Sequence, residues 1–269
     1  MNLKLIKEAI RAKSMYIKLL RPIRVKIIDL ENVINYLKNI TSRELRTVIS
    51  LANFKGDGFV TRNYVGGFNN KKIDLAWDKS LEDLPSHINI WVSEIKYRAH
   101  ICTWAAKQVQ KIPGDFVELG VFYGHLSKVI TNYAPEVLNG RNFFLVDPWG
   151  SLGENAFSNH LYNEDIFDAV KSRFEGIEQI KLIRGAVPEI LSKIPVTNVA
   201  LLLIDMNGHE AELAALNYFY PKMSRGGIIY FDDYGGRWPK LRAVVDEFLS
   251  DKPEELLTFA SPNAILIKQ

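Results

Sequence analysis

From residue 115 onwards, short apolar runs alternate with stretches in which apolar residues recur every three or four positions. Continuous apolar runs are typical of buried strands, and the second spacing is typical of helices. Five runs predict parallel strands and two more predict a closing antiparallel pair: 116–121, 142–146, 181–184, 199–204 and 228–231, then 256–260 and 264–268. Because strands that alternate with helices form a sheet covered on both faces, the pattern predicts an α/β fold.

The first 90 residues have a different pattern. Residues 3–53 are predicted to be helical because their apolar positions follow helical spacing. The stretch 55–85 contains four glycines and an Asn69-Asn70 pair, which predicts an irregular segment that is a candidate lid over a substrate. Another helix is expected over 87–111. We therefore expect an N-terminal helical segment with a lid over residues 1–90, and a ligand-binding domain over residues 91–269.

Composition adds a few exclusions. The chain has 269 residues, of which 47% are hydrophobic and 24% charged, an ordinary balance for a globular protein. The single cysteine, Cys102, excludes an intrachain disulfide framework and a zinc site of several thiolates, so a cytoplasmic location is expected. The longest apolar run, 199–204, is far shorter than the ~20 residues of a membrane span. The charged N-terminus lacks the apolar region of a signal peptide.

Positive charge is concentrated at the start of the sequence. Residues 1–30 contain eight Lys or Arg and two acidic residues, a net charge of +6, whereas the whole chain carries +3. Such a segment suits peripheral contact with an anionic membrane, although a solvated helix face is the simpler interpretation. Because the bias is local and no binding motif accompanies it, nucleic acid is not expected as a partner. We expect the protein to form a homo-oligomer.

Glycines and carboxylates lie at the ends of the first two predicted strands, at the edge where parallel sheets bind ligands. Gly120 and Gly124 would allow a tight turn and a close approach to a ligand, but their spacing is not the dinucleotide-binding fingerprint. Glu118 would repel a phosphate and suit a positively charged ligand. Asp147 could accept hydrogen bonds from both hydroxyls of a ribose, or it could cap the turn before Pro148.

Three more carboxylates follow the fourth and fifth predicted strands. Asp205 follows one, and Asp232 and Asp233 follow the other. Because adjacent strands lie ~4.8 Å apart, these side chains would converge and repel one another. A divalent cation with oxygen ligands, such as Mg²⁺, would remove that repulsion; alternatively, only one or two face the site. His209 could act as a general base or could start a helix.

These motifs resemble the macrocin O-methyltransferase-like family. Residues 113–124 resemble its opening motif, residues 205–235 resemble its second signature in spacing and residue type, and the resemblance covers residues 95–269. It implies a Rossmann-like class I methyltransferase fold in which residues 91–269 bind S-adenosylmethionine and catalyse methyl transfer. It also implies Mg²⁺ and methylation of a sugar hydroxyl.

The resemblance assigns roles to individual residues. It implies that the cofactor is bound by Glu118, Gly120, Gly124 and Asp147, to which we add Tyr123 and Gly185. It implies that the metal is bound by Asp205, Asp232 and Asp233. The sequence departs from the family where Asp205-Met206-Asn207 replaces the common Asp-Gly-Asp, and where His209 replaces a Tyr. These changes retain the expected metal ligands but alter the local charge.

The expected activity is an S-adenosylmethionine- and metal-dependent O-methyl transfer. The acceptor would be a small molecule or glycan, namely a sugar or a glycosylated or nucleotide-linked metabolite, and Asp205 or His209 would be the base. The 55–85 segment has three candidate aromatic residues, Tyr64, Phe68 and Trp77. They would either cover the sugar or pack against other residues of the protein.

Two alternative functions are kept. Tyr218 and Lys222 have the spacing of a nicotinamide-dependent sugar oxidoreductase, but Pro221 would break the helix that must align them. A scaffold subunit that binds the cofactor without turnover is the second alternative.

Overall fold

The computed structural model describes residues 54–61, 65, 70–86, 88, 92, 95–150, 165–236 and 238–269. The predicted helix over 3–53, the basic residues 1–30, Tyr64 and Phe68 lie outside these ranges. The chain divides into one compact unit of residues 1–54 and 60–64 and a second of residues 55–59 and 65–269. All elements of the site described below belong to the second unit. Within the described ranges, no helix has the length and apolar character needed to cross a membrane.

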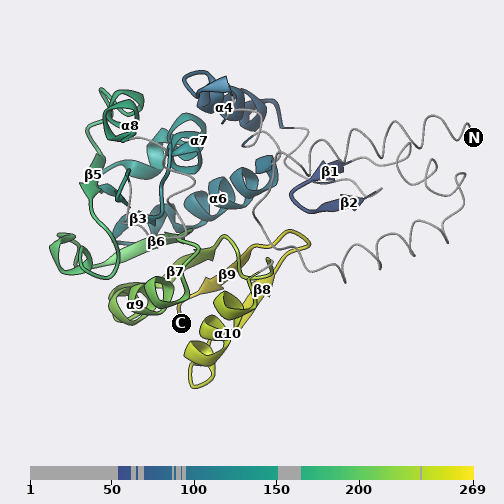
Figure 1. Cartoon of the computed structure of the whole chain (residues 1–269), viewed down its shortest axis with the longest axis vertical. Coiled ribbons are helices and arrows are strands. Elements are labelled where there is room, and N and C mark those ends of the chain that lie inside the picture. The colour runs from purple at the N-terminus through teal and green to yellow at the C-terminus, as the bar shows by residue number, and fades with distance from the viewer. Residues whose placement is uncertain are drawn as a thin grey trace, which may run out of the picture. The chain divides into compact units, whose positions relative to one another are not determined.

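A seven-stranded sheet forms the centre of the second unit (Figure 1). Its order is β5-β4-β3-β6-β7-β9-β8; the first five strands in this order are parallel, and β9 is antiparallel to both β7 and β8. The strands are β3 (Asp115–Leu119), β4 (Phe143–Asp147), β5 (Ile180–Arg184), β6 (Val199–Ile204), β7 (Met223–Phe231), β8 (Leu256–Thr258) and β9 (Ala264–Ile267). The predicted α/β sheet with an antiparallel closing pair is confirmed.

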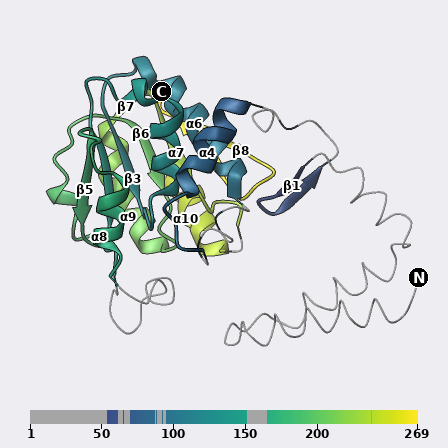
Figure 2. The same ribbon diagram turned by 90° about the horizontal axis from the view of Figure 1, so that it is seen from above.

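Helices cover both faces of this sheet (Figure 1 and Figure 2). One face is covered by α4 (Lys71–Leu81), α6 (Lys96–Gln108), α7 (His125–Tyr133) and α8 (Phe167–Arg173). The other is covered by α9 (His209–Phe219) and α10 (Pro239–Leu249). Short 3₁₀ turns are η2 (Val109–Lys111), η3 (Pro135–Leu138), η5 (Leu191–Lys193) and η6 (Tyr220–Lys222).

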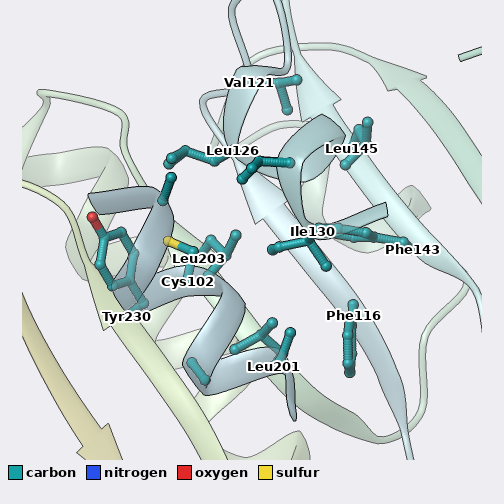
Figure 3. Packing of buried hydrophobic residues seen from close by; sticks show 14 of the residues in the cluster. Cys102, Phe116, Val121, Leu126, Ile130, Phe143, Leu145, Leu201, Leu203 and Tyr230 are labelled. Carbon is teal, nitrogen blue, oxygen red and sulfur yellow. The ribbon is translucent and has the colours of Figure 1, made fainter. Parts of the chain in front are cut away.

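The two faces take alternate residues of each strand, because successive side chains of a strand point to opposite sides. Phe116 of β3 belongs to the core under α6 and α7, whereas the next residue, Val117, belongs to the core under α9. Figure 3 shows Cys102 of α6 and Ile130 of α7 pointing toward the sheet, and Phe116 of β3 belongs to the same core cluster. Burial on both faces explains why the inner strands β4 and β6 are nearly continuous apolar runs rather than alternating ones.

The sequence predicted one irregular segment over residues 55–85, and the structure contradicts this prediction. The segment includes a two-stranded sheet of β1 (Phe54–Gly56) and β2 (Phe59–Thr61), followed by helix α4. The side chain of Asn70 accepts a hydrogen bond from the Lys72 N–H at 3.0 Å and caps α4. Trp77 is 3% exposed in the core, so it packs against the protein and is not free to cover a sugar.

The strand order changes direction between β3 and β6. The chain proceeds from β3 outward to β4 and β5, then returns to β6 on the other side of β3 and continues to β7. Parallel sheets bind ligands beyond the carboxyl ends of the strands at such a switch point. Because all five parallel strands end at the same edge, the residues that follow β3, β4, β6 and β7 are brought together there.

Candidate active site

The three predicted metal ligands lie together at this edge. Asp205 follows β6 directly and Asp232 follows β7, and the last residues of these strands, Ile204 and Phe231, are partners in the parallel register. A carboxylate oxygen from each of Asp205, Asp232 and Asp233 lies within 4.8 Å of the others. Burial, with Asp232 and Asp233 nearby, raises the pKa of Asp205 well above its usual value. A set of hard oxygen donors with this excess of negative charge fits a divalent cation.

Asp232 is held by hydrogen bonds from buried groups. Its Oδ1 accepts from the Tyr230 hydroxyl at 2.6 Å and from Asn263 Nδ2 at 3.2 Å. Asn263 also donates to the main-chain oxygen of Asp232 at 2.7 Å, and its own amide oxygen accepts from Ser261 Oγ at 2.7 Å. Because Tyr230, Asn263 and Ser261 are buried, the Asp232 carboxylate has a fixed orientation.

Arg98, in the first turn of α6, contacts the same cluster. Its Nη1 donates to Asp232 Oδ2 and lies 3.9 Å from Asp233 Oδ1. Its Nε donates to Asp57 Oδ1 at 2.9 Å, in the turn between β1 and β2. The guanidinium therefore bridges Asp57 and the carboxylate cluster.

Helix α9 contributes two further groups. His209 is its first residue and is half-buried. Glu212, one turn later, is buried, and burial together with the nearby Asp233 and Asp232 raises its pKa to about 8. The neutral form of Glu212 is therefore favoured beside the cluster.

Three side chains hold the backbone that follows β3 by hydrogen bonds. Asp147 Oδ2 accepts from the N–H groups of Val121 at 2.7 Å and Phe122 at 2.9 Å. Trp149 Nε1 donates to the Phe122 carbonyl oxygen at 2.8 Å, and Arg173 Nε donates to that of Tyr123 at 2.9 Å. Phe122 has a φ of 51°, which costs energy for a residue other than glycine. These bonds keep the loop in one shape before any ligand arrives.

The predicted cofactor glycines are required by contacts within the protein itself. A Cβ atom at Gly120 would lie 1.8 Å from the carbonyl oxygen of Asp205, and one at Gly124 would lie 2.6 Å from the ring of Phe174. A Cβ at Gly185 would lie 2.6 Å from Ile190 Cδ1. Cofactor contact by these glycines and by the buried Tyr123 remains a prediction.

The two acidic residues of the predicted cofactor site differ in their partners. Both oxygens of Asp147 already accept backbone N–H groups, since Oδ1 accepts from Trp149 at 2.6 Å. Its turn-forming role is therefore visible, and its ribose role stays a prediction. Glu118 is buried, and its Oε2 has no hydrogen-bond partner among the described residues. Burial is the main cause that raises the pKa of Glu118 to about 8; a hydrogen bond with Ser127 acts to lower this pKa, and the charge of Asp147 acts to raise it.

Several residues of this site were not predicted from the sequence. Glu212 carried a usable signal, because it lies one helical turn after His209 and seven residues after Asp205. Arg98, Asp57 and Asn263 come from distant segments, and no local pattern connects them with the carboxylates.

The comparisons with known proteins agree with this geometry. Residues 98–255 match the macrocin-O-methyltransferase (TylF) family, which is more than half of the chain. The chain belongs to this family.

Two curated relatives are O-methyltransferases from Streptomyces species. The chain is 26% identical over 166 residues to demethyldecarbamoylnovobiocin O-methyltransferase of Streptomyces niveus, covering 55% of this chain and 63% of that protein. It is 24% identical over 143 residues to 8-demethyl-8-(2,3-dimethoxy-alpha-L-rhamnosyl)-tetracenomycin-C 4'-O-methyltransferase of Streptomyces olivaceus, covering 46% and 54%. The aligned region thus spans less than two thirds of either relative.

Among solved structures, the O-methyltransferase NovP resembles this fold with a TM-score of 0.57 at 22% sequence identity. The match covers 64% of this chain and 79% of that chain. At this level of identity the likeness shows the shared fold, which is the predicted class I methyltransferase fold.

Proposed function

We propose that the protein transfers a methyl group from S-adenosylmethionine to a hydroxyl of a sugar or of a glycosylated or nucleotide-linked metabolite, with the help of a divalent cation. Family membership and the O-methyltransferase activities for which the two relatives are named support the reaction class. The observation that carries the metal-dependent form of the proposal is the convergence of Asp205, Asp232 and Asp233 beyond neighbouring strands.

The cofactor would bind beside the loop that follows β3. The buried Glu118 carboxyl, whose Oε2 lacks a partner among the described residues, suits a ligand with positive charge, such as the sulfonium and ammonium groups of S-adenosylmethionine. The bonds from Asp147, Trp149 and Arg173 to the loop support the proposal because a binding loop that is ordered in advance needs less ordering when the ligand arrives.

The chain would supply the groups that position the acceptor and remove its proton. Asp205, Asp232 and Asp233 would hold a Mg²⁺ ion, which lowers the pKa of a bound hydroxyl and orients its oxygen. Asp205 or the half-buried His209 would accept the proton that the hydroxyl releases as its oxygen gains the methyl group. Both lie after β6, at the switch point of the sheet.

The test is an acceptor screen with labelled S-adenosylmethionine and Mg²⁺, repeated in EDTA. Asp205→Ala and Asp232→Ala should abolish metal-dependent turnover, because each removes a carboxylate from the cluster. Asp251→Asn, an exposed carboxylate outside the cluster, is the control and should retain activity. Full activity in EDTA would contradict the metal-dependent form of the proposal, and absence of methyl transfer to every acceptor would contradict the reaction class.

The identity of the base is tested with His209→Asn. If His209 is the base, kcat falls by about 10²- to 10⁴-fold while Mn²⁺ affinity stays unchanged, because the carboxylate ligands are intact. If kcat falls less than threefold, His209 is not the base and the role passes to Asp205.

The two alternatives make different predictions for calorimetry with S-adenosylmethionine and NAD. An oxidoreductase would bind NAD. Against this alternative, Lys222 lies outside α9 in η6 and packs over the Tyr218 ring, with its Nζ 3.2 Å from the ring centroid. A scaffold would bind S-adenosylmethionine without turnover on any acceptor.

Three expectations about the molecule's surroundings stay predictions. They are the cytoplasmic location, assembly as a homo-oligomer and peripheral membrane contact through residues 1–30, which lie outside the described residues.

A further inference from the structure

The ion pairs of Arg98 place a permanent positive charge against the carboxylate cluster. Its Nη1 contacts Asp232 and lies within 4.0 Å of Asp233, while its Nε is held by Asp57. The side chain of Arg98 is 16% exposed, and those of Asp57 and Asp232 are 1% exposed. An arginine stays protonated in proteins, so this charge is not removed by a change of pH.

The contact also occupies a specific acceptor site on Asp232. Oδ1 already accepts two hydrogen bonds, from Tyr230 and Asn263, and Oδ2 accepts from Arg98. A cation that binds Asp232 must therefore share Oδ2 with the guanidinium or displace it. In either case two positive charges come close together in a site with little water, where their repulsion is poorly screened.

Asp57 prevents the guanidinium from turning freely toward the cluster. Its Oδ1 accepts from Nε at 2.9 Å, on the other side of the same guanidinium. The position of Arg98 is thus set by a competition between Asp57 and the cluster for one cation.

We propose that Arg98, anchored by Asp57, is the resident counter-cation of the Asp205–Asp232–Asp233 cluster and sets its affinity for divalent metal by competing for Asp232. This inference rests on the metal-dependent form of the proposed function. Arg98 is a positioning residue: it neutralises the cluster when no metal is bound and weakens metal binding when metal is present. Asp57 opposes this effect by drawing the guanidinium away.

The experiment measures Mn²⁺ affinity directly, by the electron paramagnetic resonance signal of free Mn²⁺, without any acceptor. Arg98→Gln should bind Mn²⁺ at least about tenfold more tightly than the unsubstituted protein, because the competing charge is gone. Asp57→Asn should bind it more weakly, because Arg98 then turns fully to the cluster. A merely structural role would loosen binding in both variants, so the opposite signs identify competition.

Two controls accompany these variants. Lys107→Gln removes a positive charge from the same helix, where Lys107 pairs with Glu136 at the surface, and should leave affinity unchanged. Asp205→Asn should weaken or abolish binding, which locates the measured Mn²⁺ at the cluster. Circular dichroism confirms folding of each variant. If Arg98→Gln does not fold, Arg98→Met, which also removes the charge but keeps a long side chain, takes its place: tighter binding supports the inference, and equal or weaker binding overturns it.

The outcomes separate the inference from the proposed function. If the unsubstituted protein binds Mn²⁺ and Arg98→Gln binds it equally or more weakly, the inference is overturned and the metal site stands. The inference is also overturned if Lys107→Gln tightens binding as much as Arg98→Gln does. If no variant binds Mn²⁺, the metal-dependent form of the proposed function is wrong and the inference is overturned with it.

Discussion

Glu118 is a buried carboxyl group whose charge depends on what lies beside it. Without a ligand, burial keeps it protonated and raises its pKa to about 8. A cationic ligand would reverse this preference, because an ionised carboxylate then has a partner. A residue that is unfavourable for the stability of the empty protein is thus suited to binding.

The pH dependence of stability tests this state of Glu118. Its folded pKa of about 8 lies above the ordinary value of 4.5, so the folded protein is most stable with respect to this group below pH 4.5 and loses that stability as the pH rises through 8. Glu118→Gln stays neutral at every pH. Its free energy of unfolding, measured with urea at about pH 5 and about pH 8.5, should therefore decrease less with pH than that of the unsubstituted protein.

Glu175→Gln, an exposed change on the chain that follows α8, serves as the control and should keep the original pH dependence. An unaltered slope in Glu118→Gln would show that Glu118 is already ionised in the folded protein at neutral pH.

The loop after β3 shows how neighbouring elements position one segment. Asp147 ends β4, Trp149 follows that strand and Arg173 ends α8, and all three side chains bind backbone atoms of the loop. Arg173 also donates to the carbonyl oxygen of Ser80 in α4 at 2.7 Å. The shape of the loop therefore depends on elements on either side of it as well as on its own glycines.

Arg173→Met tests this dependence. It leaves the buried carbonyl oxygens of Tyr123 and Ser80 without their donor, which should lower the free energy of unfolding by about 1–3 kcal/mol. If the loop binds the cofactor as proposed, the dissociation constant for S-adenosylmethionine should also increase. Lys171→Met, an exposed change in the same helix, should alter neither quantity by calorimetry or urea denaturation. Equal behaviour of the two variants would argue against the role of Arg173.

The sequence predicted the elements whose signal is local. Short runs with apolar residues marked all seven strands of the main sheet, although the run at 181–184 has only two apolar residues between Lys181 and Arg184. The carboxylates after β6 and β7 were expected to meet because parallel strands end at one edge. β7 begins at Met223 rather than at residue 228. The two glycines before residue 228 carry no apolar signal, but the Gly226 N–H donates to the Lys268 carbonyl oxygen and the Lys268 N–H donates to that of Gly227, so both belong to the sheet.

Other features depend on tertiary contacts and could not be predicted locally. Helix α4 was hidden because the glycines and asparagines that precede it suggested a loop extending through it, although Asn70 is its cap. Arg98 has no partner in its own segment that could indicate its role. Its contacts with Asp57 and Asp232 join residues 41 and 134 positions apart.

At the scale of the whole molecule, the site depends on how closely β3 and β6 approach at the switch point. Gly120, after β3, packs against the main chain of Asp205, after β6, with no room for a side chain. The loop after β3 and the carboxylate cluster therefore share one backbone contact, and the central strands set the separation between this loop and the cluster.

Gly120→Ala tests this contact. Its φ of 82° and the 1.8 Å approach to the Asp205 oxygen mean that the methyl group must move the strands apart. We expect a loss of about 2–5 kcal/mol in the free energy of unfolding, from strain of about 1–2 kcal/mol plus overpacking of about 1–3 kcal/mol. Gly140→Ala, at a φ of 75° with open space around it, isolates the strain alone. Equal losses in the two variants, measured by urea denaturation, would contradict the close contact.

The place of β9 in the sheet has a consequence for the order in which the protein is made. β9 lies between β7 and β8 but is synthesised after both, and Asn263, just before it, holds Asp232. While the ribosome is still translating β8, Asp232 lacks this donor and the edge of β7 is unpaired. The nascent chain can assemble strands β3 to β7 early, but it can orient Asp232 only when Asn263 and β9, which pairs with β8, have emerged from the ribosome.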